Sequence, residues 1–248
     1  MKISFVIPAY NEEASISACV RSIQAELART PLDAEIIVVD NASKDRTGEI
    51  ARGIPGVRVV QEPRKGLPFA RQAGFRASLG DLIANIDADT LLPPGWLSTA
   101  LRCFSTENIV GLSGPYEYHD LPLRGRILTR VLEGIGFIFY LFNHYVRGKD
   151  GMVAGGNFLI RRDALEKIGG FDTSVEFWGE DVTTMRRLEK VGIVRWSWRF
   201  RILASGRRFM AEGILRRNLR DVTNYFAIML KGKPKTFQYE DVRLPPRS

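Results

Sequence analysis

The chain has 248 residues, of which 45% are hydrophobic, and it carries a formal net charge of +8 at pH 7. This length and composition predict one large α/β domain with an elaborated C-terminal part. Its two cysteines are too few for a disulfide framework, so the sequence excludes a small disulfide-stapled fold and indicates a reducing compartment. The positive charge suits nucleic acid, an anionic membrane surface or a phosphate-bearing substrate, and it does not choose among them.

The N-terminal part of the sequence alternates predicted strands with predicted helices. Residues 3–7 form an apolar strand that we expect Pro8 to end, and no small-residue cleavage site follows that would indicate a signal peptide. A helix of about five turns comes next, because apolar residues recur at spacings of three and four between residues 16 and 27. A β-branched strand then completes a parallel βαβ unit. The later strands predicted in this part cover residues 35–40, 57–60, 82–86 and 109–112.

Three acids lie at the ends of predicted strands. Asp87 and Asp89 end the apolar run that begins at Leu82, and Asp40 ends the strand over residues 35–40. Strand alternation would place side chains i and i+2 on one face, so Asp87 and Asp89 can approach one cation; Mg²⁺ and Mn²⁺ favour carboxylate and phosphate oxygens. An acid at the end of a second strand commonly bonds a ribose hydroxyl. All three acids also suit turns or helix caps.

A cationic segment precedes the acidic pair. Arg64, Lys65 and Arg71 lie in residues 64–74, which lead into a predicted helix that runs to Leu79. Such a segment fits a pyrophosphate that is contacted by cations on one side and through a metal on the other. The alternative is a solvated surface turn.

Residues 127–146 are the most apolar stretch of the chain, and Arg130 and Glu133 interrupt it. It fits either a core helix or a helix in a membrane interface with basic residues at the lipid headgroups. Two glycines and the lack of a clean polar face favour the core helix. No stretch reaches roughly 18 uninterrupted apolar residues, so we expect no membrane-spanning helix.

The second half of the chain supplies another acidic pair. Glu180 and Asp181 begin a predicted helix, where acids are ordinary caps and dipole partners. A strand introduced by Gly155 and Gly156 precedes them, and Trp178 lies beside them. Close backbone approach and an aromatic wall are features of a substrate pocket, which favours a functional role for the pair.

The chain is strongly basic from residue 195 onward. Arg207 and Arg208 follow a predicted strand over residues 200–204 and a Ser-Gly turn. Phosphate, lipid headgroups and nucleic acid all remain open as partners of this part.

Taken together, these pieces resemble a family 2 glycosyltransferase with the GT-A fold, an α/β fold with a Rossmann-like, mostly parallel central sheet. The matching segments are residues 7–13, 39–47, 65–74, 87–89, 169–172 and 179–181. They occur in the family's order and extend to about residue 192. The resemblance suggests a nucleotide-binding half over residues 1–112, an acceptor-binding half over 113–210, and a basic C-terminal helix and tail over 211–248.

The resemblance implies roles for particular residues. Pro8, Tyr10 and Glu12 would line the base and ribose site, with Asp40 holding the base or ribose. Asp89 would ligate Mg²⁺ or Mn²⁺ at the donor diphosphate, and Asp87 would contact the metal or the ribose.

On the acceptor side, Asp181, with Glu180 beside it, matches the acidic pair whose Asp is the catalytic base in inverting members. Lys65, Arg71 and Arg207 would stabilise the leaving nucleoside diphosphate. The family's processive members carry a Gln-x-x-Arg-Trp motif, and Arg195-Trp196 lacks the preceding Gln.

The expected activity is therefore metal-dependent, inverting transfer of one sugar from a UDP- or GDP-sugar to a saccharide or lipid-linked saccharide, as in polysaccharide biosynthesis. The expected place is the cytoplasm, at the inner face of the membrane with peripheral contact, and no nucleic acid is expected as a partner. Transfer to a polyprenyl phosphate is a second enzymatic alternative. A non-catalytic basic module that binds membrane or nucleic acid is the alternative from another class.

Overall fold

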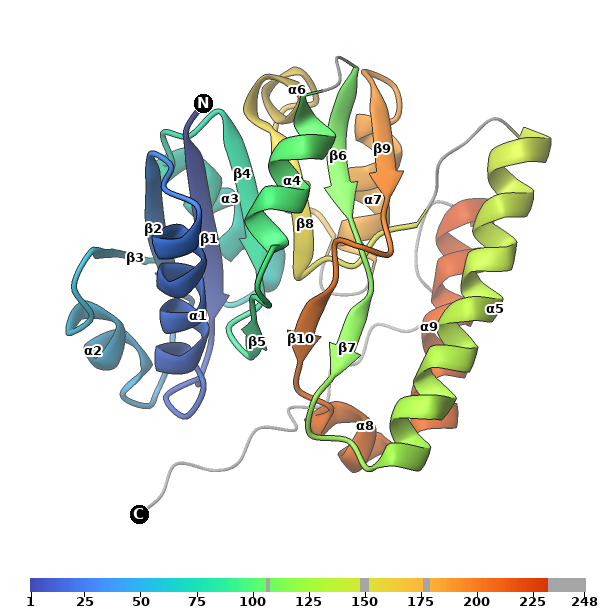
Figure 1. The fold of residues 1–248 in the computed structure, drawn as a ribbon, viewed down its shortest axis with the longest axis horizontal. Helices are drawn as coiled ribbons and strands as arrows, with labels where there is room; N and C mark the ends of the chain where they lie inside the picture. Colours follow the sequence, from blue (N-terminus) through green and yellow to red (C-terminus); the bar gives the residue numbers. More distant parts are fainter. Residues whose placement is uncertain (106–107, 148–151, 176–178, 232–248) are drawn as a thin grey trace.

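The computed structural model describes residues 1–105, 108–147, 152–175 and 179–231. A large sheet forms the centre of the molecule, helices cover both of its faces, and a smaller sheet and three further helices lie beside it (Figure 1). The predicted α/β architecture with a mostly parallel sheet and a helical C-terminal extension is confirmed.

The large sheet is mixed. In the described part of the chain its seven strands run in the order β3 (Val57–Gln61), β2 (Ala34–Asp40), β1 (Ile3–Ala9), β4 (Leu82–Ile86), β8 (Asn157–Arg161), β6 (Ile109–Ser113) and β9 (Ile193–Trp196). Only β8 is antiparallel to its neighbours, and it separates β4 from β6. β6 is therefore not adjacent to β4, although the βαβ pattern predicts one continuous parallel arrangement for the strands of the N-terminal half.

The end of β1 and the place of the acidic pair differ from those predicted. β1 continues through Pro8 to Ala9, where it pairs with β2 alone, since its pairing with β4 stops at Val6. A proline is tolerated there because one side of the strand needs no donor. β4 ends at Ile86, so Asp87 and Asp89 lie in the turn before β5 (Thr90–Leu91) and not in the strand itself.

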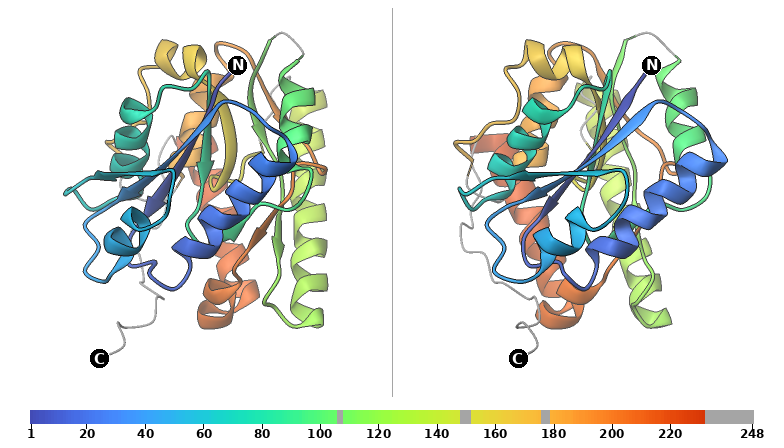
Figure 2. Two further views of the ribbon diagram at one scale, coloured as in Figure 1. Left: turned by 60° about the vertical axis from the view of Figure 1, so that its left-hand side comes forward. Right: turned by 90° about the vertical axis from the view of Figure 1, so that its left-hand side faces the viewer.

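The two helical layers pack against separate hydrophobic clusters. One face carries α1 (Ile16–Arg29), α2 (Thr47–Arg52) and α4 (Trp96–Phe104), and the other carries α3 (Leu67–Ala77), α6 (Arg162–Lys167) and α7 (Glu180–Leu188). Figure 2 shows the first of these layers from the side. α1 has 14 residues, about four turns instead of the five predicted, and buries Ile16, Val20 and Ile23 as its periodicity predicts.

Buried polar groups join the layers behind the acidic turn. Glu26 of α1 is fully buried, and its two carboxylate oxygens accept the N–H groups of Gly95 and Leu97 at 3.2 and 3.1 Å. A carboxylate at these N–H groups satisfies free donors at the start of α4. Asn157 of β8 accepts a hydrogen bond from Trp96 Nε1 at 2.9 Å, and its Nδ2 donates to the Phe200 carbonyl at 2.6 Å. The segment after Asp89 and the start of β8 are thus fixed to one core.

A second, small sheet and three helices complete the described part of the chain. β5, β10 (Ile202–Ala204) and β7 (Tyr116–Tyr118) form the sheet, followed by α8 (Arg207–Glu212) and α9 (Ile214–Lys231). Residues 127–146 belong to one long helix, α5 (Leu123–Arg147), which lies beside α9 at the edge of the molecule (Figure 1). The core interpretation of this stretch is wrong for Ile127, Val131 and Ile138, which are 55, 54 and 66% exposed. No helix among the described residues is long and apolar enough to span a membrane.

We predict that Gly74→Ala lowers the free energy of unfolding by about 2 kcal/mol, because overpacking a tight interface costs roughly 1–3 kcal/mol. A Cβ at Gly74 in α3 would lie 2.2 Å from Val6 Cγ1 and 3.1 Å from Val39 Cγ2. Chemical denaturation measures the change. The matched control is Gly134→Ala in α5, where a Cβ meets nothing within 4 Å. Equal destabilisation by both variants would contradict this packing of α3 on the sheet.

Candidate functional site

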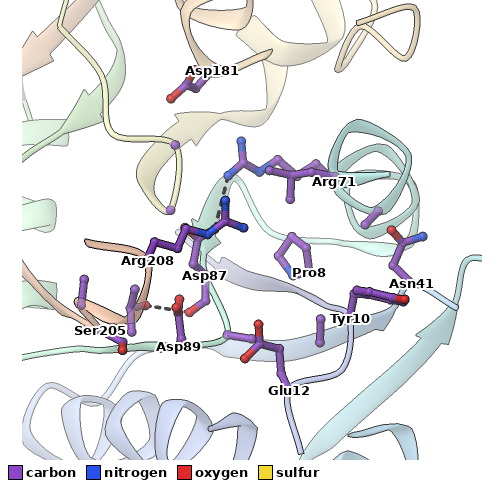
Figure 3. Close-up of a pocket in the computed structure, with 18 of the residues that line it drawn as sticks. Pro8, Tyr10, Glu12, Asn41, Arg71, Asp87, Asp89, Asp181, Ser205 and Arg208 are labelled. Atoms are coloured by element: carbon purple, nitrogen blue, oxygen red, sulfur yellow. Dashed lines mark hydrogen bonds and ion pairs between the residues drawn. The ribbon is translucent and has the colours of Figure 1, made fainter. Parts of the chain in front are cut away.

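A pocket of about 460 Å³ opens where β1 and β4 end, between the large and the small sheet. Figure 3 shows Asp89 and Glu12 on one side of this pocket and Asp181 on the other, with Asp87 and Arg71 between them. The lining side chains come from segments spread over most of the sequence. They include Pro8, Tyr10, Glu12, Asn41, Lys65, Arg71, Asp87, Asp89, Tyr116, Tyr118, Glu180, Asp181, Ser205, Arg207, Arg208 and Arg217.

Asp87 is held in place from several directions. Its carboxylate lies 3.5 Å from Arg71 Nη2 and accepts a hydrogen bond from the Tyr116 hydroxyl at 3.4 Å. The same hydroxyl accepts the N–H of Gly156 at 2.8 Å. A Cβ at Gly156 would lie 2.1 Å from the Asp87 carboxylate, so only glycine leaves room for this arrangement.

Arg71 connects the two sides of the pocket. Its side chain is 2% exposed, and its other terminal nitrogen donates to the buried Glu180 carboxylate at the start of α7. A Cβ at Gly155 would lie 3.0 Å from both terminal nitrogens of Arg71. Arg71 therefore lies in the pocket, but its guanidinium, which was expected to stabilise the leaving diphosphate, bonds two carboxylates.

The acidic pair on α7 is buried to different degrees. Burial raises the pKa of Glu180 to about 7, and the positive charge of Arg71 opposes that rise. Burial also raises the pKa of Asp181, which is half-buried and accepts the Val182 N–H at 2.8 Å. Because the Glu180 carboxylate bonds Arg71, Asp181 is the acid of this pair that is available to a ligand in the pocket.

Asp89 and Glu12 share one arginine. Arg207 of α8 lies 3.0 Å from Asp89 Oδ2, and its Nη1 donates to Glu12 Oε2 at 2.9 Å. Burial raises the pKa of Asp89 to about 6; Arg207 opposes the rise, and the charges of Asp87 and Glu12 add to it. To contact a phosphate as expected, Arg207 would therefore have to bond the phosphate alongside these two carboxylates or release one of them.

The donor atoms at this place fit a hard divalent cation. Asp87 and Asp89 offer carboxylate oxygens, and because burial, with the charges of Asp87 and Glu12 adding to it, raises the pKa of Asp89, a bound cation would favour its ionised form. Within the described residues no group of three or more His, Cys, Asp or Glu side chains could hold a metal on its own. Mg²⁺ is commonly bound by one or two carboxylates together with substrate phosphates, so the two aspartates fit such a site when a diphosphate completes it.

The expected base and ribose residues lie at one end of the pocket. Pro8, Tyr10 and Glu12 all line it, and Lys65 Nζ lies 4.0 Å from the centre of the Tyr10 ring. Asn41 lines it as well; its side chain donates to the carbonyls of residues 62 and 64 at 3.0 and 2.7 Å. These two hydrogen bonds hold the loop that carries Lys65 against the end of β2.

Asp40 is the expected site residue that the structure does not bring to the pocket. Its carboxylate accepts the Ser43 N–H at 3.1 Å and Gln61 Nε2 at 2.9 Å, and it lies against Gly48 of α2. These contacts direct it to the side of the sheet that α2 covers. Asp40 therefore holds the end of β2 and the loop after it, and its assignment to the base or ribose stays a prediction.

Sequence reasoning missed several lining residues. Tyr116 and Tyr118 lie on a short strand with no distinct pattern, and Arg217 lies on α9, far from any recognised motif. A signal was present for Gly155 and Gly156, whose pairing in sequence indicated close backbone approach. Trp178, expected as an aromatic wall, lies outside the described residues.

Comparison with known proteins gives a family match. The sequence pattern of glycosyl transferase family 2 matches residues 4–169. An undecaprenyl-phosphate 4-deoxy-4-formamido-L-arabinose transferase of Pseudomonas paraeruginosa is 38% identical over 98 residues, which is 37% of this chain and 29% of that protein. The chain thus spans less than a third of that relative's length.

Two solved structures share the fold. A mannosyltransferase of Pyrobaculum calidifontis, in complex with GDP-Man and Mn²⁺, has a TM-score of 0.69 at 21% identity over 92% of this chain and 64% of that one. Glucosyl-3-phosphoglycerate synthase of Mycobacterium tuberculosis, with Mn²⁺, UDP-Glc and phosphoglyceric acid, has a TM-score of 0.61 at 23% identity, covering 95% and 81% of the two chains. These similarities establish the GT-A type of α/β fold.

We predict that Arg71→Met lowers the free energy of unfolding by about 3–5 kcal/mol, the usual cost of leaving a buried partner charge uncompensated. Glu180 and Asp87 would both lose their guanidinium contact. Urea denaturation measures the loss, and the double variant R71M/E180Q recovers part of it because the second buried charge is also removed. Unchanged stability of R71M would show that Arg71 is not the buried link described here.

Proposed function

The chain belongs to glycosyl transferase family 2, and from this premise we propose that it is a metal-dependent, inverting glycosyltransferase. It moves a single sugar from a UDP- or GDP-sugar to a saccharide or a lipid-linked saccharide. The observation that carries the proposal is the pocket itself, which has Asp87 and Asp89 on one side and Asp181 on the other. The donor diphosphate needs a cation-binding site on one side of the pocket, and the acceptor hydroxyl needs a base on the other.

The donor side consists of Pro8, Tyr10 and Lys65 around the nucleoside, with Asp87 and Asp89 at the diphosphate. Asp89 and Asp87 would hold Mn²⁺ or Mg²⁺. When bound there, the cation neutralises charge that develops on the leaving diphosphate. The two similar structures named above contain Mn²⁺ together with a guanosine or a uridine donor, which supports a nucleotide sugar and leaves its base open.

Asp181 is the proposed catalytic base. The acceptor hydroxyl must lose its proton as its oxygen attacks the anomeric carbon, and a carboxylate at hydrogen-bond distance can take that proton. Its pKa is raised by burial, which makes Asp181 a stronger base than an exposed aspartate. One direct displacement inverts the anomeric centre, so an α-linked donor gives a β-linked product.

Cations around the pocket would stabilise the departing nucleoside diphosphate. Arg207 and Arg208 lie at the start of α8, Lys65 lies beside Tyr10, and Arg217 faces the pocket from α9. Fixed positive groups aimed at developing negative charge lower the barrier to its formation. Arg71 has a different role: its side chain is buried between Glu180 and Asp87 and positions both sides of the site, whereas the Arg207 side chain is 26% exposed.

A polyprenyl phosphate is the second candidate acceptor. The similarity to an undecaprenyl-phosphate transferase and the arginines on the pocket wall favour it. A phosphate acceptor is already ionised and needs little help from a base. In the remaining alternative, a non-catalytic basic module, the acids gathered in this pocket would have no role.

We predict that one UDP- or GDP-sugar binds in a calorimetric screen and that Mn²⁺ strengthens this binding at least tenfold. Asp89→Ala removes that strengthening, because one of the two carboxylates that would hold the cation is lost. Asp33→Ala is the matched control, since the Asp33 side chain is 71% exposed and lies outside the pocket. Mn²⁺-dependent donor binding that persists at full strength in Asp89→Ala would overturn the metal assignment.

We predict that Asp181→Asn lowers kcat by about 10²–10⁴-fold, the usual contribution of a general base, and leaves donor binding intact. Wild-type kcat/KM rises with pH through the raised pKa of Asp181, above the ordinary value near 3.9 for aspartate, and the variant lacks this rise. Steady-state rates over a pH series measure both effects.

The matched control for Asp181→Asn is Asp163→Asn on α6, where the side chain is 64% exposed. A small effect of Asp181→Asn combined with a severe effect of Arg208→Ala would favour the polyprenyl phosphate acceptor over a hydroxyl.

A further inference from the structure

One edge of the molecule exposes large apolar side chains. It is formed by α5, α8 and α9, which lie together beside the small sheet (Figures 1 and 2). We call the exposed side chains of these helices the helical edge surface. Its apolar members are Leu123, Ile127, Val131, Ile135, Ile138 and Tyr145 of α5, Met210 of α8, and Leu215, Leu219 and Val222 of α9, with exposed fractions between 47 and 80%.

α9 has the orientation opposite to that of a helix on a water-exposed surface. Leu215 and Leu219 are 66 and 67% exposed. Polar side chains of the same helix point inward: Arg217 lines the catalytic pocket, and Asn224 is buried. A surface helix ordinarily turns its apolar stripe to the core and its charges to water, so the outer face of α9 is suited to an apolar environment.

The outer face of α5 has the same character. Its exposed apolar residues recur at spacings of four and three from Leu123 to Ile138, which keeps them on one side of the helix. A second cavity of about 410 Å³ opens among them, between Leu123, Ile127 and Val131 and the strand β7. Tyr116 and Tyr118 line both this cavity and the catalytic pocket.

The most exposed charges on this edge are positive. Arg124, Arg126 and Arg130 of α5 and Arg216 of α9 are exposed, and Arg130 also contacts Glu117 at 2.9 Å. Among the described residues of α5, α8 and α9, no acidic residue is as exposed as these arginines; the Asp221 side chain, which is 40% exposed, pairs with Arg217 at 3.5 Å. Two copies of the chain that met through this surface would bring arginines of like sign together, which disfavours self-association as its use.

We propose that the helical edge surface binds the surface of an anionic lipid bilayer. The apolar side chains enter the boundary between headgroups and acyl chains, and the arginines contact the anionic headgroups, as in other interfacial helices. The helices lie in the interface and do not cross it, in agreement with the absence of a spanning helix among the described residues. This orientation brings the second cavity, and through Tyr116 and Tyr118 the catalytic pocket, to the lipid. The proposal does not depend on which reaction the pocket performs.

The test is co-sedimentation of the full chain with vesicles of phosphatidylcholine alone or with phosphatidylglycerol added. We expect binding to the mixed vesicles that weakens at high salt, and at least fivefold weaker binding to phosphatidylcholine alone. The double variants L215S/L219S on α9 and I127S/V131S on α5 each lower the partition coefficient about tenfold or more, because two apolar side chains no longer enter the lipid.

The matched controls are elsewhere on the surface. Leu79→Ser changes a leucine that is 71% exposed between α3 and β4, and it leaves vesicle binding unchanged. Arg216→Glu weakens binding, whereas Arg102→Glu on α4 does not. Thermal melting checks that every variant folds as the wild type does.

Two results would overturn the proposal. The first is binding of either double variant at the wild-type level, which would place the contact elsewhere on this basic chain. The second is a wild-type chain that ignores anionic vesicles but forms dimers in sedimentation velocity, with L215S/L219S remaining a monomer. That outcome would make the surface an interface between copies.

Discussion

A single buried guanidinium organises the site. Arg71 extends from α3 and bonds Glu180 at the start of α7 and Asp87 after β4, and its side chain is 2% exposed. Buried charges must be paired, so these three elements have one mutual arrangement. Glycines 155 and 156 leave the space that the contact needs, because a Cβ at either would crowd Arg71 or Asp87. Asp87 and the start of α7, which carries Asp181, therefore keep a fixed spacing without any ligand, and substrate binding does not have to assemble them.

Much of the fold follows from local sequence pattern. The apolar periodicity of α1 and the apolar runs of β1, β2 and β4 identify those elements, because each pattern lies within a few neighbouring residues. The position of β8 is different: an apolar run over residues 157–161 fits a strand in either direction, and its pairing partners lie far away in the chain. Of the small sheet, only β10 was predicted as a strand, because β5 and β7, with two and three residues, are too short to show a period. For α9 the pattern specifies an apolar face but not whether that face turns inward or outward.

The acids of the site were easier to predict than their partners. Acids at strand ends and helix starts can be recognised from position alone, and Asp87, Asp89 and Asp181 do meet in one pocket. Arg71 and Arg207 were expected at phosphates, yet each bonds two carboxylates, because only the folded chain shows which charges are buried together. Asp40 had the same sequence context as Asp87 but faces Gly48 and Gln61, since it ends a strand covered by α2 on that side.

The central claim is that this pocket performs one direct displacement at an anomeric carbon. The most direct measurement is proton NMR of the sugar first released when the enzyme hydrolyses an α-linked nucleotide sugar in water, recorded before the anomers equilibrate. The account predicts the β anomer, because water would enter from the Asp181 side, opposite the diphosphate. Initial release of the α anomer would mean retention of configuration and would contradict a single displacement with Asp181 as base.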